Sequence, residues 1–325
     1  MNARGTAGRL LVGLIVVVLL AGCASSPPTV KVTENVSNES ANPVLVPGVL
    51  DVYALAKAGR WPVVVMLHGG GGERKELRAY ARKVADLGFV VFAPDWGQAR
   101  GGAADVSWYD YFLATESQVA CAVEFARAHA AEYGGDPATV ILFGHSGGAS
   151  IGAQVAFARP EPSAGCLGGT TLGAIDALVT WEGNFILSVN VPDLDGILAA
   201  EPRVLDVITP WRYLAEHKDQ KVVMLVSENP GAQFERKVGD PWAADSWLAV
   251  RDPSGVLRRQ LEANGAFADG TLGFADEQQL LFSVLQAQGN PVSLDVMPDS
   301  VHDRLSDAGW KVFLAAFGKA VGTED

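Results

Sequence analysis

The stretch "ILFGHSGGAS", residues 141–150, places a serine between glycines directly after an apolar run. A short apolar, β-branched run is typical of a strand buried on both faces, and the small residues that follow can begin a helix. The pattern Gly144-x-Ser146-x-Gly148 matches the sharp strand-to-helix turn that holds a serine hydroxyl clear of a sheet. We therefore predict that Ser146 is a displayed nucleophile and not part of an ordinary structural turn.

The same alternation of strand and helix runs outward from this stretch in both directions. Further buried strands are expected at residues 61–67, 89–93, 175–181, 221–226 and 292–297, and helices at about 74–87, 115–133, 147–158, 210–217, 275–288 and 305–319. This alternation predicts an α/β protein with a mostly parallel, doubly wound sheet and helices on both faces. In such folds the active site lies at the carboxyl ends of the strands, which is where Ser146 falls.

A serine hydroxyl reacts only when a base removes its proton, so the histidines are the next question. His302 follows the last predicted strand and precedes the last predicted helix, in a loop that reaches over the nucleophile in this architecture. His145 is adjacent to Ser146, so its side chain points elsewhere, and His129 and His217 lie in or beside predicted helices. We assign His302 as the general base.

A run of glycines supplies candidate groups for stabilising negative charge. "HGGGG", residues 68–72, follows the strand at 61–67, and glycine allows backbone amides to approach a substrate oxygen closely. The amides of Gly70 and Gly71, together with that of Gly147, would form an oxyanion hole. The loop lacks the Lys-Ser/Thr of a phosphate-binding loop, which argues against nucleotide binding.

These motifs resemble those of serine esterases of the α/β-hydrolase superfamily, of the dienelactone-hydrolase-like and hormone-sensitive-lipase-like types. The matching stretches are "VVVMLHGGGG", "GFVVFAPDW", "GGDPATVILFGHSGGA" and "VMPDSVHD", and the resemblance covers most of residues 60–320. It implies an α/β-hydrolase fold, a Ser-His-acid triad and cleavage of carboxylic esters through an acyl-enzyme. No metal-ligand spacing occurs, and we expect neither a metal nor a cofactor.

The acid of the triad stays open at the level of sequence. The family usually places an aspartate shortly after the fifth predicted strand, where this chain has Ser227-Glu228-Asn229-Pro230. Glu228 is one candidate, because a glutamate can also orient a histidine. Asp269 is the other leading candidate, since it precedes "GTLGFADEQQLL" and lies 33 residues before His302. Glu182, at the end of the fourth predicted strand, is a third option.

Choosing Asp269 requires an insertion ahead of the last helix–strand unit. Residues 230–268 would form this insertion, and they are a candidate lid over the site. The aromatic residues between 96 and 112 fall in a predicted loop, where they could line a pocket or pack on the body.

The first 23 residues resemble a bacterial lipoprotein signal peptide. Arg4 and Arg9 precede an apolar run of about eleven residues, which is too short to span a bilayer comfortably and argues against a transmembrane anchor. The run ends in Leu-Ala-Gly-Cys, the pattern of a lipobox. We predict cleavage before Cys23, lipidation of its thiol, and attachment to a bacterial membrane in the cell envelope.

The residues after Cys23 complete the predicted organisation. Residues 24–43 are polar and contain prolines, which predicts a flexible tether ahead of a single domain at 44–325. The mature chain would keep 23 basic and 37 acidic residues, a net charge of −14, which argues against nucleic acid as a partner. Cys121 and Cys166 remain, and an exported protein can pair them in a disulfide, although two buried thiols are the alternative.

The sequence therefore predicts a lipid-anchored serine hydrolase that acts on a small or polymeric ester. Because fold alone does not fix the substrate, a peptidase or polyester hydrolase with the same triad is an alternative. A catalytically silent binding lipoprotein on the same scaffold is the alternative from a different class.

Overall fold

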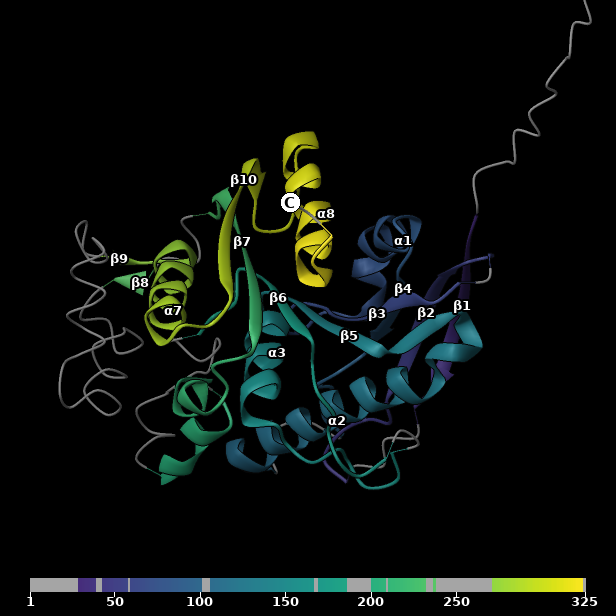
Figure 1. Cartoon of the computed structure of the whole chain (residues 1–325). Helices are drawn as coiled ribbons and strands as arrows, with labels where there is room; N and C mark the ends of the chain where they lie inside the picture. Colours follow the sequence, from purple (N-terminus) through teal and green to yellow (C-terminus); the bar gives the residue numbers. More distant parts are fainter. Residues whose placement is uncertain are drawn as a thin grey trace, which may run out of the picture.

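An eight-stranded sheet runs through the molecule (Figure 1). The computed structural model describes residues 29–38, 43–57, 59–100, 106–166, 169–185, 200–208, 210–231, 236–237 and 271–323. The strand order is β1-β2-β4-β3-β5-β6-β7-β10. The strands are β1 (Val30–Ser37), β2 (Val49–Leu55), β3 (Trp61–Leu67), β4 (Val90–Pro94), β5 (Gly135–His145), β6 (Ala177–Trp181), β7 (Lys221–Asn229) and β10 (Val292–Val301). The pairs from β4 to β10 are parallel, and β2 lies antiparallel to both β1 and β4.

Helices cover both faces of this sheet (Figure 1). One face carries α1 (Arg78–Asp86) and α8 (Asp307–Val321), and the other carries α2 (Trp108–His129), α3 (Gly147–Ala158) and α7 (Phe274–Gln288). Short 3₁₀ segments are η1 (Arg74–Leu77), η3 (Ala130–Tyr133), η4 (Pro202–Asp206), η5 (Pro210–Arg212) and η6 (Leu214–Glu216), and β8 (Arg236–Lys237) pairs with β9 (Thr271–Leu272). The doubly wound α/β fold is therefore confirmed.

The apolar runs form central strands because they supply both layers of the core. In β3, Val63 and Val65 pack toward α2 and α3, whereas Val64 and Met66 pack toward α1 and α8. All four side chains are fully buried. A strand enclosed by helices on both faces needs this unbroken apolar sequence, since a polar side chain on either face would lose its hydration.

The chain enters the fold earlier than the sequence suggested. Residues 30–37, which were expected to belong to a tether at 24–43, form β1, with Val30 opposite Leu55 and Ser37 opposite Val49 of β2. β1 is an edge strand with partly exposed side chains, so its polar composition is compatible with a strand. Asn35 also accepts a hydrogen bond of 2.7 Å from the buried guanidinium of Arg74. The domain therefore begins before residue 44.

Other expectations fall partly or wholly outside the described residues. These are the signal peptide at 1–23 with Cys23, almost all of the insertion at 230–268, and Asp269. Lipidation of Cys23 and the lid stay predictions. Among the described residues, no helix has the length and apolar character needed to cross a membrane.

Two features on the α2 side of the sheet refine the sequence reading. The aromatic segment expected to be a loop already turns helical at Trp108, because Ser107 caps α2 by accepting a hydrogen bond of 3.0 Å from the amide of Asp110. Cys121 in α2 and Cys166 after α3 form a disulfide, with 5.5 Å between their Cα atoms.

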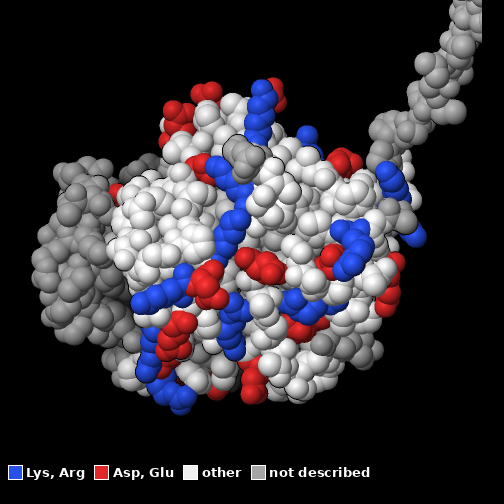
Figure 2. Space-filling view, in the orientation of Figure 1, with Lys and Arg blue, Asp and Glu red and all other residues white. Residues whose placement is uncertain are grey.

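On the face seen in Figure 2, basic and acidic side chains are interspersed.

Candidate active site

Ser146 lies at the sharp turn between β5 and α3, and the glycines around it are required by packing. A Cβ atom on Gly144 would lie 2.1 Å from the carbonyl oxygen of Gly148, and one on Gly148 would lie 2.3 Å from that of His68. Ser146 itself has φ 53° and ψ −122°, a strained conformation for a residue with a side chain. Its amide donates to the carbonyl of Trp181 at 2.8 Å, which fixes the turn to the end of β6.

Glu182 is the carboxylate that the fold brings to His302. It follows Trp181 at the carboxyl end of β6, and its φ of 51° turns the chain sharply there. One carboxylate oxygen accepts a hydrogen bond from Nδ1 of His302, and the other accepts one from the amide of Ser227. The side chain is 0% exposed, and these two donors compensate for the water it has lost.

The structure contradicts one of the two leading sequence candidates for the triad acid and does not describe the other. Glu228 is exposed at the end of β7 and accepts a hydrogen bond of 2.7 Å from the amide of Asp299, so it bonds to a backbone amide and not to His302. The expectation for Glu228 is corrected in favour of Glu182, because β6 is the direct neighbour of β5 whereas β7 is one strand further away. Asp269 lies outside the described residues.

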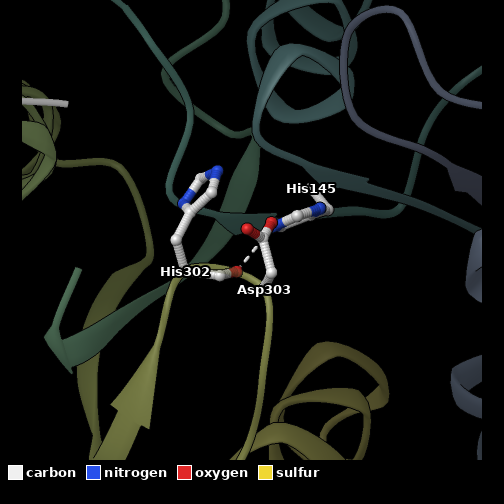
Figure 3. A group of neighbouring side chains, drawn as sticks. All are labelled: His145, His302 and Asp303. Carbon is white, nitrogen blue, oxygen red and sulfur yellow. Dashed lines mark hydrogen bonds between the residues drawn. The ribbon is translucent and has the colours of Figure 1, made fainter. Parts of the chain in front are cut away.

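His302 is held in place on several sides. Its ring is buried and stacks on Phe274 with 4.6 Å between ring centroids and an interplanar angle of 7°. Its backbone carbonyl accepts from Nε2 of His145 at 2.8 Å, and the two imidazole rings lie 4.7 Å apart (Figure 3). Since His145 is adjacent to Ser146, this contact brings the loop of β10 to the elbow.

His145 acts in this contact as a neutral donor. Burial, reinforced by the nearby His302, lowers the pKa of His145 to about 4, so its ring carries no charge at neutral pH. The His145 ring is directed elsewhere than toward a role as base, as predicted, since its Nε2 bonds to the His302 carbonyl. The sequence did not reveal that this ring supports the His302 loop. No sequence pattern near Phe274 indicated that its ring stacks on His302.

A group of potential metal ligands also lies here. In the described part of the chain, His145, His302 and Asp303 each offer a ligand atom, and these atoms lie within 4.8 Å of one another. Figure 3 shows the His302 ring directed away from Asp303, whose carboxylate lies beside the His145 ring. One nitrogen of each imidazole is already engaged, by Glu182 or by the His302 carbonyl. These two bonds account for the placement of the two imidazole rings.

The glycine loop after β3 lies directly beside the elbow. A Cβ atom on Gly147 would come within 2.7 Å of the amide nitrogen of Gly70, so the two backbones are in close contact. His68 supports the loop from beneath: Nδ1 donates to the carbonyl of Gly69 at 2.8 Å, and the ring stacks on Trp96. Burial lowers the pKa of His68, which keeps its ring neutral. The residues expected to form an oxyanion hole are therefore adjacent in space.

A cavity of about 650 Å³ opens from these glycines. Gly70, Gly71 and Gly147 are among its lining residues, and the other walls are mostly apolar. The wall residues include Trp96, Trp108, Tyr111, Phe112, Ile151, Val207 and Ile208. Three of the aromatic side chains at the start of α2, Trp108, Tyr111 and Phe112, thus line a pocket, one of the two roles that their sequence allowed.

The parallel sheet, the elbow after β5 and the histidine loop after β10 together define the α/β-hydrolase fold. A family model described as BD-FAE matches residues 50–167, a span that includes the glycine loop and the elbow. No curated protein sequence matches the chain significantly.

Solved structures of esterase 2 from Thermogutta terrifontis are similar to this chain. The apo form has a TM-score of 0.60 and 16% identity, and the match covers 93% of this chain and 98% of that one. The butyrate-bound form has a TM-score of 0.58 and 17% identity over 89% and 95% of the two chains. A form phosphorylated by paraoxon has a TM-score of 0.58 and 16% identity over 92% and 96%. At these identities the likeness establishes the fold.

Proposed function

We propose that this protein is a serine hydrolase that cleaves carboxylic esters, with Ser146, His302 and Glu182 as its triad. The observation that carries the proposal is the buried hydrogen bond from Nδ1 of His302 to Glu182, beside the strained elbow at Ser146. This bond fixes the proton on Nδ1 and leaves Nε2 with a lone pair, which is the tautomer that a general base requires.

In the first half of the reaction, Nε2 of His302 takes the hydroxyl proton while the oxygen of Ser146 attacks the ester carbonyl. The negative charge that develops on the carbonyl oxygen is stabilised by the amide of Gly147 and by amides of Gly70 or Gly71. His302 then gives its proton to the leaving alcohol, and the acyl group stays on Ser146. Water repeats these steps and releases the carboxylic acid.

The pocket supports an ester with an apolar group on one side of the reacting carbonyl. Its aromatic and aliphatic walls offer no charged partner among the residues that line it, and a volume of about 650 Å³ accommodates more than a short acyl chain. Butyrate and paraoxon, which occupy or modify the structurally similar esterase 2, are accordingly suitable first probes.

Kinetics with p-nitrophenyl butyrate test the proposal. Ser146→Ala should reduce kcat/KM by a factor of about 10⁵ or more, because both the nucleophile and the covalent route are lost. Ser163→Ala changes a buried serine that does not line the pocket, so it is the matched control and should keep full activity. Unchanged hydrolysis by a folded Ser146→Ala variant would refute the proposal, and wild-type protein that hydrolyses peptides but no ester would favour the peptidase alternative.

A further inference from the structure

The N-terminal segment enters the fold on the side of the sheet opposite the active site. We call this side, where the parallel strands begin, the amino edge. Val30, the first residue of β1, pairs with Leu55 at the carboxyl end of β2. Because β2 is antiparallel to β4, this end of β2 lies at the amino ends of the parallel strands. Ser146, Glu182 and His302 all lie at the carboxyl ends.

Only a short segment separates this entry point from the predicted lipid. Five residues, Ala-Ser-Ser-Pro-Pro, stand between Cys23 and Thr29, and the Thr29 carbonyl accepts a hydrogen bond of 2.9 Å from Ala56. Even a fully extended chain of this length reaches only about 20 Å. If Cys23 is lipidated, the amino edge of the sheet is therefore confined close to the bilayer surface.

The surface at this entry point is apolar. An open groove of about 540 Å³ is lined by Trp61, Leu87, Phe89 and Leu314, among others. Leu87 is 50% exposed, the second highest value among the large hydrophobic side chains in the described ranges. The indole of Trp61 donates to the carbonyl of Lys57, next to Ala56, so the groove adjoins the place where the chain enters.

Charged side chains of both signs surround the groove. Lys57, Arg60 and Lys311 are exposed there, Arg60 pairs with Asp136 at 3.0 Å, and Asp86 lies beside Leu87. Because both signs are present, electrostatic attraction to anionic lipid is weak at this edge. Apolar contact and the acyl chains would supply the adhesion, in keeping with an acidic protein.

We propose that the amino edge of the sheet, with the groove at Trp61, Leu87 and Leu314, rests on a phospholipid bilayer, and that the active site opens toward water on the opposite edge. β3 spans seven residues from one edge to the other, which corresponds to about 20 Å. The triad is then held above the headgroups, so the enzyme acts on esters that arrive from the aqueous compartment and not on lipids of its own membrane. The inference rests on lipidation of Cys23.

Fluorescence quenching in vesicles tests this orientation. The full-length lipoprotein is reconstituted into vesicles of phosphatidylcholine and phosphatidylglycerol, with a single new thiol carrying an NBD probe. Leu87→Cys reports the amino edge, and Leu113→Cys, near the start of α2, is the matched control because Leu113 is 38% exposed. Arg60→Cys gives a second report on the amino edge in case the first variant does not fold.

Lipids with a doxyl group near the headgroup should remove about half of the fluorescence at Leu87 or Arg60 and leave that at Leu113 unchanged. Equal quenching at both edges, quenching at Leu113 alone, or quenching at neither edge would overturn the proposal. Mass spectrometry of the N-terminal peptide is done first, and an unmodified Cys23 also overturns it. None of these outcomes depends on esterase activity, so failure here is distinguishable from failure of the proposed reaction.

Discussion

Replacing Glu182 by glutamine should invert the hydrogen bonding of His302 without a change in side-chain volume. One oxygen of Glu182 accepts from the amide of Ser227, a backbone donor that the substitution leaves in place. The glutamine oxygen will therefore face Ser227, and its NH₂ group will face Nδ1 of His302. That nitrogen must then accept a hydrogen bond, which moves the imidazole proton to Nε2 and removes the lone pair that takes the proton of Ser146.

The expected loss in kcat is about 10³- to 10⁴-fold, which corresponds to about 4–5.5 kcal/mol of transition-state stabilisation. The KM should change little, because Glu182 is fully buried and does not line the pocket. The substitution also removes a buried charge, so a loss of folding is not expected from it.

Initial rates with p-nitrophenyl butyrate, together with thermal unfolding followed by circular dichroism, give the comparison. Glu228→Gln is the matched control: Glu228 is exposed, and a glutamine oxygen can still accept from the amide of Asp299. Its activity should stay within about twofold of wild type. Folded Glu182→Gln that keeps more than about a tenth of wild-type kcat, or Glu228→Gln that is impaired as severely, would contradict the assignment of Glu182 as the acid.

Three further predictions concern packing and stability. Gly148→Ala should abolish activity and soluble expression, because its Cβ atom would lie 2.3 Å from a backbone carbonyl oxygen. Burial raises the pKa of Glu116 to about 9, so the folded protein holds a proton there that the unfolded chain releases above about pH 4.5. Stability should therefore fall as pH rises from 4.5 toward 9, and Glu116→Gln should relieve up to about 4 kcal/mol of this loss between pH 5 and pH 8 in urea unfolding. Reducing the disulfide between Cys121 and Cys166, which closes a loop with a sequence separation of 45, should lower the free energy of unfolding by about 4 kcal/mol.

Each of these has a matched control. Gly152→Ala, in the same helix as Gly148, should be tolerated, since its Cβ atom would lie 3.6 Å from its nearest neighbour. Glu161→Gln changes an exposed carboxylate and should leave the pH dependence of stability as it is in the wild type. The double replacement of Cys121 and Cys166 by serine should reproduce the effect of reduction, and equal stability of the reduced and oxidised proteins would contradict the disulfide's role.

The sequence predicted the central sheet well because burial on both faces leaves a strong local pattern. The strands expected at 61–67, 89–93 and 221–226 correspond to β3, β4 and β7, and the apolar run before Ser146 corresponds to the end of β5. β1 and β2 were both missed; for β1 the reason is that an edge strand has a partner on one side only and needs little apolar sequence. Its serine, threonine and asparagine residues have the composition of a linker, so composition alone could not separate it from a tether.

In the candidate site, too, local sequence identified one residue and could not identify another. Ser146 could be identified because the glycines at 144 and 148 are a local steric requirement, which the short Cβ distances make explicit. The choice of Glu182 depends on which strand lies next to β5 and on the positive φ of Glu182 itself. Its partner His302 is also 120 residues away in sequence. Neither property is written in the sequence "TWEGNF", so Glu182 could be considered but not preferred.

Covalent labelling measures whether Ser146 is an activated nucleophile. The protein is treated with a fluorophosphonate, digested and analysed by mass spectrometry, with Ser146→Ala and Glu182→Gln in parallel. We expect one adduct on Ser146 in the wild type, none in Ser146→Ala, and labelling of Glu182→Gln that is slower by about 10³-fold or more. Folded wild-type protein that takes up no label, or takes it up at another serine, would contradict the account.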